Sequence, residues 1–228
     1  MRSVLRTRLV IAVAVAALVG IVPAAPAHAA RYNASSNPVL LVHGWASSAG
    51  SWNTMVDRFR ADGWPASRVR AFSYNTAQSN ATTAAQVRSE VDSLLAATGA
   101  SKVDIISHSM GALSTRYYLK NLGGTTRVDR WVSLGGPNHG TNTASVCPMT
   151  SCVEMRVGSA FLAALNSGDE TPGSPVYGTW RSPCDLVINP VSSTVLAGAT
   201  NTVTGCVDHN TLQTDPTVYA QARDFVNP

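Results

Sequence analysis

The sequence predicts an α/β fold in which about six mostly parallel strands carry helices on both faces. Short runs of consecutive apolar residues, such as PVLLV at 38–42, are typical of strands buried on both faces of a parallel sheet. Between such runs lie segments with apolar residues at helical spacing, such as 51–61 with Met55 and Phe59. Strands that alternate with helices indicate a parallel sheet covered on both sides.

Each predicted element has a local signal in the sequence. Gly63 and Gly99 end the first two helices, and Asp215 with Pro216 begins the last one as cap and first helical residue. The predicted strands are 38–42, 69–74, 102–106, 128–134, 185–188 (the end of a fifth unit) and 200–204. The predicted helices are 51–61, a helix capped by Asn80 or Thr82 that runs to Thr98, 112–122, 153–165 and the one that starts at 215.

The first 29 residues read as a secretory signal peptide. Arg2, Arg6 and Arg8 form a basic start, residues 9–22 are apolar or Gly, and Ala27-His28-Ala29 suits a cleavage site. The alternative, a membrane anchor, is disfavoured because the apolar run is too short to span a bilayer. We expect export by general secretion and cleavage near Ala29, which leaves residues 30–228 as a single domain without repeats or low-complexity linkers.

The charge balance argues against nucleic acid as a partner. The whole chain has 17 basic and 13 acidic side chains, and its formal net charge is +4. Because three of the arginines lie in the predicted leader, the remaining chain is near neutral. A near-neutral surface favours a neutral or mixed substrate.

Four cysteines, Cys147, Cys152, Cys184 and Cys206, all follow the predicted leader. An even number in an exported chain predicts two disulfides. No Cys-x-x-Cys or paired His spacing supports a zinc site, so we expect no metal. Three pairings are possible, and we favour Cys147 with Cys152 and Cys184 with Cys206 for a reason given below.

Ser109 is the candidate nucleophile. It lies in Ser107-His108-Ser109-Met110-Gly111, directly after an apolar strand and before a helix. This is the context of the Gly-x-Ser-x-Gly nucleophile elbow of α/β-hydrolases, which needs small residues two positions before and after the serine. Gly111 matches the pattern, and Ser107 departs from it but is still small. The alternative is a serine that merely caps the helix.

An oxyanion hole needs two N–H donors aimed at one oxygen. The backbone N–H of Met110, the residue after the nucleophile, is the first candidate. The second is the N–H of Trp45 in His43-Gly44-Trp45, which ends the first strand, and Gly44 would allow close approach. We expect His43 to be structural, because in this fold the base follows the nucleophile and the acid in the chain.

His209 is the better candidate for the base. It follows the sixth predicted strand, whereas His139 has no suitable acid before it and is expected to be a rim or structural residue. Five acidic residues are candidates for the role that orients the base: Glu154, Asp169, Glu170, Asp185 and Asp208. Asp185 suits it best, because it sits beside an apolar run and next to Cys184; the alternative is an ordinary surface aspartate.

The favoured disulfide pairing follows from this assignment. Cys184 adjoins the proposed acid, and Cys206 lies three residues before the proposed base. If Asp185 and His209 touch, the loops that carry them are close enough for a bridge between the two cysteines.

The chain resembles the class-2 family of small secreted bacterial triacylglycerol lipases. The matching segments are 38–44, 103–111, 118–122 and 132–136, so the likeness is strongest from Pro38 to about Asn138. After Gly140 it rests on 185–187 and His209. The resemblance implies a minimal α/β-hydrolase fold, the triad Ser109, Asp185 and His209, and an oxyanion hole at Trp45 and Met110. Ser107 and the two cysteine pairs depart from the family pattern.

These residues predict an ester hydrolase that forms an acyl-enzyme, without metal or cofactor. A triacylglycerol lipase is the first expectation. A short-chain or polyester esterase is the alternative, and a non-catalytic secreted binding domain is the rival from another class. We expect a monomer that meets lipid or ester substrates, with lipid–water interfaces included, at an open and shallow site. Trp45, Trp52, Met110 and Met149 are candidates for an acyl-binding surface, although core packing explains each of them equally well.

Overall fold

The structure is a computed structural model that describes residues 32–33 and 35–228 of the chain. The predicted signal peptide at 1–29 lies outside the described residues. In the described part, no helix is both long enough and apolar enough to cross a bilayer.

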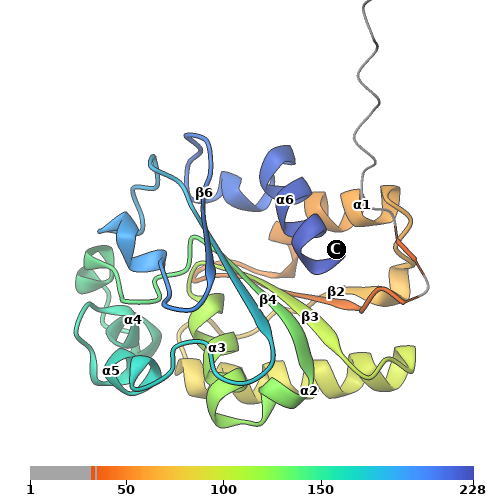
Figure 1. Ribbon diagram of the computed structural model, residues 1–228. Helices are drawn as coiled ribbons and strands as arrows, with labels where there is room; N and C mark the ends of the chain where they lie inside the picture. Colours follow the sequence, from red (N-terminus) through yellow and green to blue (C-terminus); the bar gives the residue numbers. More distant parts are fainter. Residues whose placement is uncertain (1–31, 34) are drawn as a thin grey trace, which may run out of the picture.

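One sheet of six parallel strands, in the order β2-β1-β3-β4-β5-β6, organises the fold (Figure 1). The strands are β1 (Val39–Val42), β2 (Val69–Ala71), β3 (Val103–His108), β4 (Val128–Leu134), β5 (Val176–Arg181) and β6 (Thr200–Val203). The predicted α/β fold with about six parallel strands is confirmed. The chain runs from β1 to one edge and then returns past β1 to the other, so the strand order reverses between β1 and β3. In open α/β sheets, binding crevices form at such a point, beyond the carboxyl ends of the strands.

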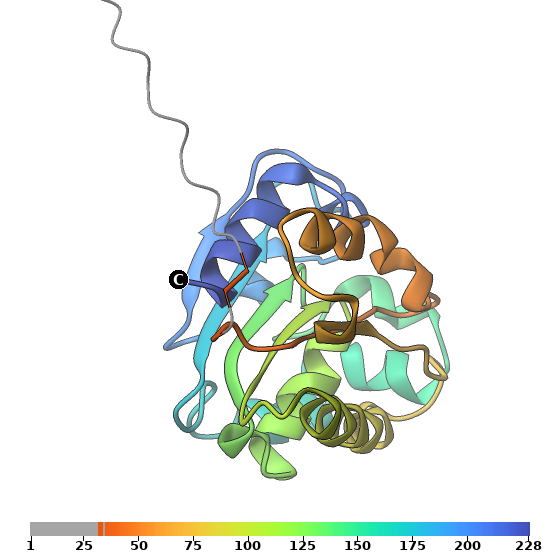
Figure 2. The same cartoon turned by 90° about the vertical axis from the view of Figure 1, so that its right-hand side faces the viewer.

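Helices cover both faces of the sheet. Figures 1 and 2 show α1 and α6 on one face and α2 and α3 on the other. The α-helices are α1 (Asn53–Ala61), α2 (Asn80–Thr98), α3 (Gly111–Asn121), α4 (Thr150–Met155), α5 (Ala160–Asn166) and α6 (Pro216–Val226). Short 3-10 helices are η1 (Ala49–Trp52), η2 (Ala66–Arg68), η3 (Gly124–Thr126), η4 (Asn142–Val146), η5 (Val191–Thr194) and η6 (Thr211–Gln213).

Each face of the sheet has its own apolar core. Successive side chains of β1 enter different cores. Leu41 packs with Trp52 and Phe59 of the η1–α1 segment, while Leu40 packs with Val91 of α2. All five are fully buried. Burial on both faces explains why β1 and β3 read as continuous apolar runs.

A third, smaller cluster lies beside the sheet rather than under it. Helices α4 and α5 pack against α3 through Leu113, Met155 and Leu162 (Figure 1). Met110, directly after the nucleophile candidate, belongs to the same cluster. The cluster therefore connects the α4–α5 segment to the start of α3.

The fifth predicted strand was misplaced. The strand is Val176–Arg181, and residues 185–188 lie in the loop that follows it. In this loop Val187 and Ile188 line a cavity, whereas Leu186 is 87% exposed. An apolar run alone does not distinguish a strand from a loop that lines a site.

Two helix boundaries also differ from the prediction. The helix expected over 153–165 is two helices, because Gly158 adopts a positive φ of 76° and Ser159 caps α5 by accepting a hydrogen bond from the Leu162 N–H. The cap of α2 is Ser79, not Asn80 or Thr82. At the last helix, Asp215 accepts bonds from the Thr217 and Val218 N–H groups, as predicted.

Candidate active site

Ser109 lies in a sharp turn between β3 and α3, next to the point where the strand order reverses. Its φ is +54°, a strained value for a residue with a side chain. The Ser109 N–H donates to the Leu134 carbonyl at 2.9 Å, which ties the turn to the end of β4. The strained turn is the local geometry expected of a nucleophile elbow.

Glycines allow the elbow to lie close to the loop after β1. A Cβ on Gly111 would come within 2.6 Å of the carbonyl oxygens of Val42 and His43, and a Cβ on Gly44 would come within 2.7 Å of the Ser109 Cβ. Neither contact is tolerable, so both positions require glycine. The departure at Ser107 is accommodated, because this fully buried side chain donates to the Val132 carbonyl at 2.8 Å.

Two backbone N–H groups beside Ser109 are available as donors. Within the described residues, the N–H groups of Trp45 and Met110 donate to no protein acceptor. Trp45 precedes Ala46, which has a φ of +53° and is the other non-glycine residue described with a positive φ. Strain on both sides of the crevice indicates that these loops are shaped for a ligand rather than for stability.

Asp185 and His209 meet in the loops after β5 and β6. His209 Nδ1 lies 2.7 Å from Asp185 Oδ2, and the two residues are 6% and 5% exposed. Because a carboxylate can only accept, Nδ1 carries the proton and Nε2 keeps a free lone pair. The other carboxylate oxygen, Oδ1, accepts from the N–H groups of Val187 and Ile188 at 2.8 and 2.9 Å.

The hydrogen bonds to Asp185 keep it ionised. Burial alone would raise the pKa of this carboxyl, but the bond and charge of His209 and the two backbone N–H groups outweigh burial, and the pKa is lowered. An ionised carboxylate can hold the imidazole in one orientation and stabilise its protonated form.

The other acidic candidates are engaged elsewhere. Glu154 accepts hydrogen bonds from Ser79 and Asn80 at the start of α2, where a negative charge is favourable. Asp169 accepts from the Thr171 N–H, and Glu170 lies 2.7 Å from His139 Nε2. Asp208 is exposed and accepts from the N–H groups of residues 210 and 211. Among the five candidates, Asp185 is the one that contacts His209.

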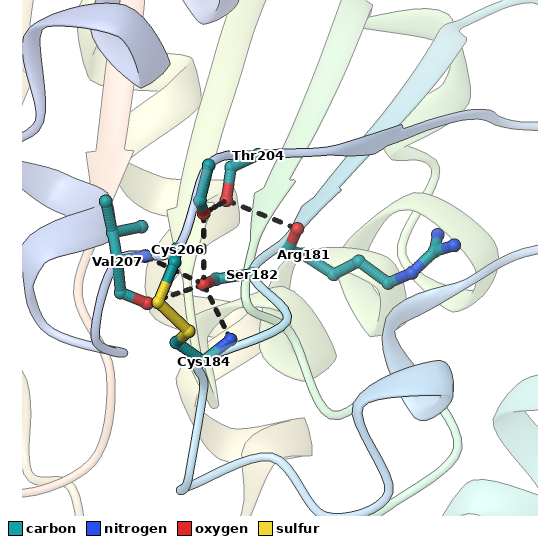
Figure 3. Close-up of a disulfide and its surroundings, with 7 residues drawn as sticks. Arg181, Ser182, Cys184, Thr204, Cys206 and Val207 are labelled. Carbon is teal, nitrogen blue, oxygen red and sulfur yellow. Dashed lines mark hydrogen bonds between the residues drawn. A yellow bond between two sulfur atoms is a disulfide. The ribbon is translucent and has the colours of Figure 1, made fainter.

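A disulfide and a buried hydroxyl join the two loops that carry Asp185 and His209 (Figure 3). Cys184 and Cys206 are bonded, with their Cα atoms 5.0 Å apart, as favoured from the sequence. The Ser182 Oγ accepts from the N–H groups of Cys184 and Val207 at 3.1 and 3.0 Å and donates to the Val207 carbonyl at 2.5 Å. The acid loop and the base loop are thus tied by covalent and polar links on one side of the site.

A cavity of about 670 Å³ contains both Ser109 and His209 in its lining. Trp45 lies at its rim and is 42% exposed. Besides Trp45 and Ala46, its apolar lining is Ala144, Val146, Cys147, Cys152, Met155, Val187 and Ile188. Most of these residues belong to the η4–α4 segment, so the third apolar cluster forms one wall of the cavity.

The second disulfide lies in this wall. Cys147, directly after η4, is bonded to Cys152 of α4, as favoured from the sequence. The Arg156 guanidinium donates to the Cys147 carbonyl at 2.9 Å, which adds a polar link across the same short loop. Of the four residues considered for an acyl-binding surface, Trp45 lines the cavity, Trp52 and Met110 are buried in cores, and Met149 is exposed outside the lining.

The remaining histidines separate into three roles. His43 is buried, its Nδ1 is 2.8 Å from the Gly44 carbonyl, and its ring stacks on Tyr74, which agrees with the structural role expected for it. His139 bonds Glu170 at 2.7 Å and does not line the cavity. His108 contacts His209, a contact that the sequence analysis missed because the residue occupies a variable position of the elbow motif. No sequence signal would have revealed it.

In the described part of the chain, no group of three or more His, Cys, Asp or Glu side chains is arranged to hold a metal ion.

Comparison with known proteins identifies the family. The family described as Lipase (class 2) matches residues 36–218, which is most of the chain. The chain belongs to the class 2 lipase family. It is therefore a carboxylic ester hydrolase of the lipase and esterase kind. The matched range contains Ser109, Asp185 and His209.

Solved structures, two of them described as lipases, share the fold of this class 2 lipase. The mature form of the Bacillus licheniformis lipase BlEst2 superposes with a TM-score of 0.75 at 16% identity, over 85% of this chain and 93% of that one. Aspergillus fumigatus lipase B gives 0.71 at 19% identity, over 86% of this chain and 54% of that one. A Listeria innocua gene product gives 0.65 at 14% identity, over 84% and 94% of the two chains. At sequence identities this low, the structural likeness shows a shared fold and nothing more.

Proposed function

We propose that the chain is a secreted triacylglycerol lipase that works through Ser109, His209, Asp185 and an acyl-enzyme intermediate. One observation carries the proposal. His209 is held by Asp185 at 2.7 Å, and it lines the same cavity as the strained Ser109. An imidazole oriented by a carboxylate beside a serine in such a turn is the arrangement that activates a hydroxyl as a nucleophile.

In the first step, His209 Nε2 accepts the proton of Ser109 as its Oγ attacks the ester carbonyl. Protonated His209 then gives the proton to the leaving alcohol, which leaves the acyl group on Ser109. In the second step, His209 takes a proton from water as the water attacks the acyl carbonyl, and that proton passes to the Ser109 Oγ as the acid leaves. The described residues contain no hydrogen bond between Ser109 and His209, and such bonds are often long before substrate binds.

The oxyanion of each tetrahedral intermediate is bound by the N–H groups of Trp45 and Met110. Both lack a protein acceptor among the described residues and both adjoin Ser109, directly or across Gly44. Fixed donors of this kind stabilise the developing charge without reorganisation during the reaction.

The apolar wall of the cavity favours a substrate with a hydrocarbon acyl chain. The wall formed by Ala144, Cys147, Cys152 and Met155 offers apolar surface but no charged side chain. The similar solved structures named above include lipases from Bacillus and Aspergillus, which supports a lipid ester. A short-chain or polyester esterase is the second candidate, favoured by the exposed Trp45 at the rim, which is available to an aromatic or bulky substrate.

The two disulfides and the signal-peptide pattern of residues 1–29 support export of a single catalytic domain. We expect this domain to act as a monomer on lipid or ester substrates, dissolved or at a lipid–water interface.

Hydrolysis of esters with acyl chains of graded length, measured beside a Ser109→Ala variant, tests the proposal. The wild type should hydrolyse long-chain glycerol esters, and the variant should lose activity by a factor of about 10⁶ with an unchanged melting temperature. A serine-directed phosphonate should label Ser109 and inactivate the wild type. Turnover by the variant would refute the nucleophile, activity confined to short acyl chains would favour the esterase, and absence of labelling would favour a binding domain.

A further inference from the structure

His108 is a buried imidazole that the proposed reaction leaves without a role. It is the last residue of β3, is 3% exposed, and immediately precedes Ser109 in the chain. Its Nε2 lies 2.8 Å from the backbone carbonyl oxygen of His209, although 101 positions separate the two residues. The backbone of the nucleophile and the backbone of the proposed base are therefore connected through one side chain.

The chemistry of this contact fixes the tautomer of His108. A carbonyl oxygen can only accept, so the proton sits on Nε2 and Nδ1 carries a lone pair. Nδ1 is buried and has no partner among the described residues. Protonation at Nδ1 would create a buried charge and an unpaired donor, both of which are costly. Burial, and next the neighbouring His209, accordingly lower the pKa of His108 to about 3.

The surroundings of His108 hold its ring in place. The His209 ring lies 4.6 Å away between centroids, and the ring of the buried Trp52 lies 6.5 Å away between centroids and nearly perpendicular to it. The titratable groups that influence it are His209 and Asp185 from the loops after β6 and β5, and His43 from the end of β1. A neutral, buried donor at this place attaches the base loop to the elbow.

We propose that His108 is a positioning residue, whose Nε2–H bond to the His209 carbonyl sets where the imidazole of His209 lies relative to Ser109. This inference rests on the proposed function, since it assumes His209 as the base. It adds a constraint that the Asp185 bond does not supply. Asp185 fixes the rotation of the ring, whereas the bond from His108 fixes the backbone from which the ring extends.

Replacement with and without a donor tests the role. His108→Leu and His108→Met keep bulk but remove the N–H, whereas His108→Gln keeps an N–H donor at about the same reach. We expect kcat to fall about 10–100-fold in the Leu and Met variants, with KM within about twofold, because misplacing a catalytic group by a fraction of an ångström has effects of this size. The Gln variant should recover kcat to within about fivefold of the wild type by the same reasoning.

His139→Leu is the matched control, because it removes a histidine that does not line the cavity. The kcat of this variant should stay within about twofold of the wild-type value. Phosphonate inactivation of Ser109 should slow in the Leu and Met variants by the same factor as kcat, which reports the nucleophile without turnover. If His108 served only in packing, the Gln variant would lose as much activity and as much thermal stability as the Leu variant. That result would overturn the proposal.

Nitrogen-15 spectra of the histidine rings in the unmodified protein give a second readout. His108 should appear as the neutral Nε2–H tautomer at every pH from about 5 to 9. A ring that carries its proton on Nδ1, or that titrates in this range, contradicts the proposal even if the Leu and Met variants do not fold. Activity retained by Ser109→Ala would instead show that the proposed function is wrong, so the two failures are distinguishable.

Discussion

The two disulfides constrain different regions of the molecule. Cys184–Cys206 joins the loops that carry Asp185 and His209, so it acts on groups proposed to transfer protons. Cys147–Cys152 closes a short loop in the apolar wall, so it acts on the surface proposed to hold the acyl chain. One bridge thus links the loops of the proposed acid and base, and the other lies in the cavity wall, so we expect their removal to have different effects. Changes near the first disulfide should therefore alter kcat, and changes near the second should alter chain-length preference.

Among changes near the two disulfides, the largest effect is expected at Asp185, the proposed acid. Asp185→Asn keeps the shape of the side chain but turns the acceptor for His209 Nδ1 into an amide, which favours the wrong tautomer of the ring. We expect kcat to fall about 10⁴-fold with KM changed little, as measured by steady-state ester hydrolysis.

Asp208→Asn is the matched control for Asp185→Asn, because Asp208 is exposed, adjoins His209 and makes only local hydrogen bonds. Its kcat should stay within about twofold of the wild type. Equal losses in the two variants would show that the contact between Asp185 and His209 has no special place in the reaction.

An intermediate effect is expected from opening the first disulfide. The double variant Cys184→Ser, Cys206→Ser releases a loop with a separation of 22 residues, which should cost about 3 kcal/mol of unfolding free energy. For a chain of this size, the melting temperature should drop by about 6–12 °C in thermal scans. The Ser182 hydrogen bonds remain, so we expect kcat to fall about 10-fold rather than vanish. An unchanged kcat would contradict the proposed effect of this disulfide on Asp185 and His209.

The smallest effect on stability is expected from opening the second disulfide. Cys147→Ser with Cys152→Ser releases a separation of only 5 residues, worth about 2 kcal/mol. We expect the ratio of kcat/KM between long and short acyl esters to fall about threefold or more, since a methylene contact in an apolar pocket is worth about 1 kcal/mol. Loss of kcat on all chain lengths alike would contradict the division of roles between the two bridges.

Sequence patterns predicted the strand–turn–helix around Ser109 because the signals there are local. The apolar run of β3, the following small residues and Gly111 act within a few positions of each other. The patterns failed at 185–188, where Leu186 and Val187 are apolar yet exposed and Val187 lines the cavity. They failed again at 153–165, where a positive φ at Gly158 interrupts what the apolar spacing presents as one helix. In both places, the local pattern resembles that of a regular strand or helix, and the surrounding structure decides which conformation the chain adopts.

By itself, the sequence determined the fold class, the order of Ser109, Asp185 and His209 along the chain, and the cysteines available for bridging, because periodicity and motif spacing are properties of the chain alone. Only the tertiary structure decided that Asp185, among five acidic candidates, contacts His209, and that His108 bonds the His209 backbone. Residues separated by 24 and 101 positions meet there because parallel strands end at one edge of the sheet, and no local pattern encodes which loops that edge brings together.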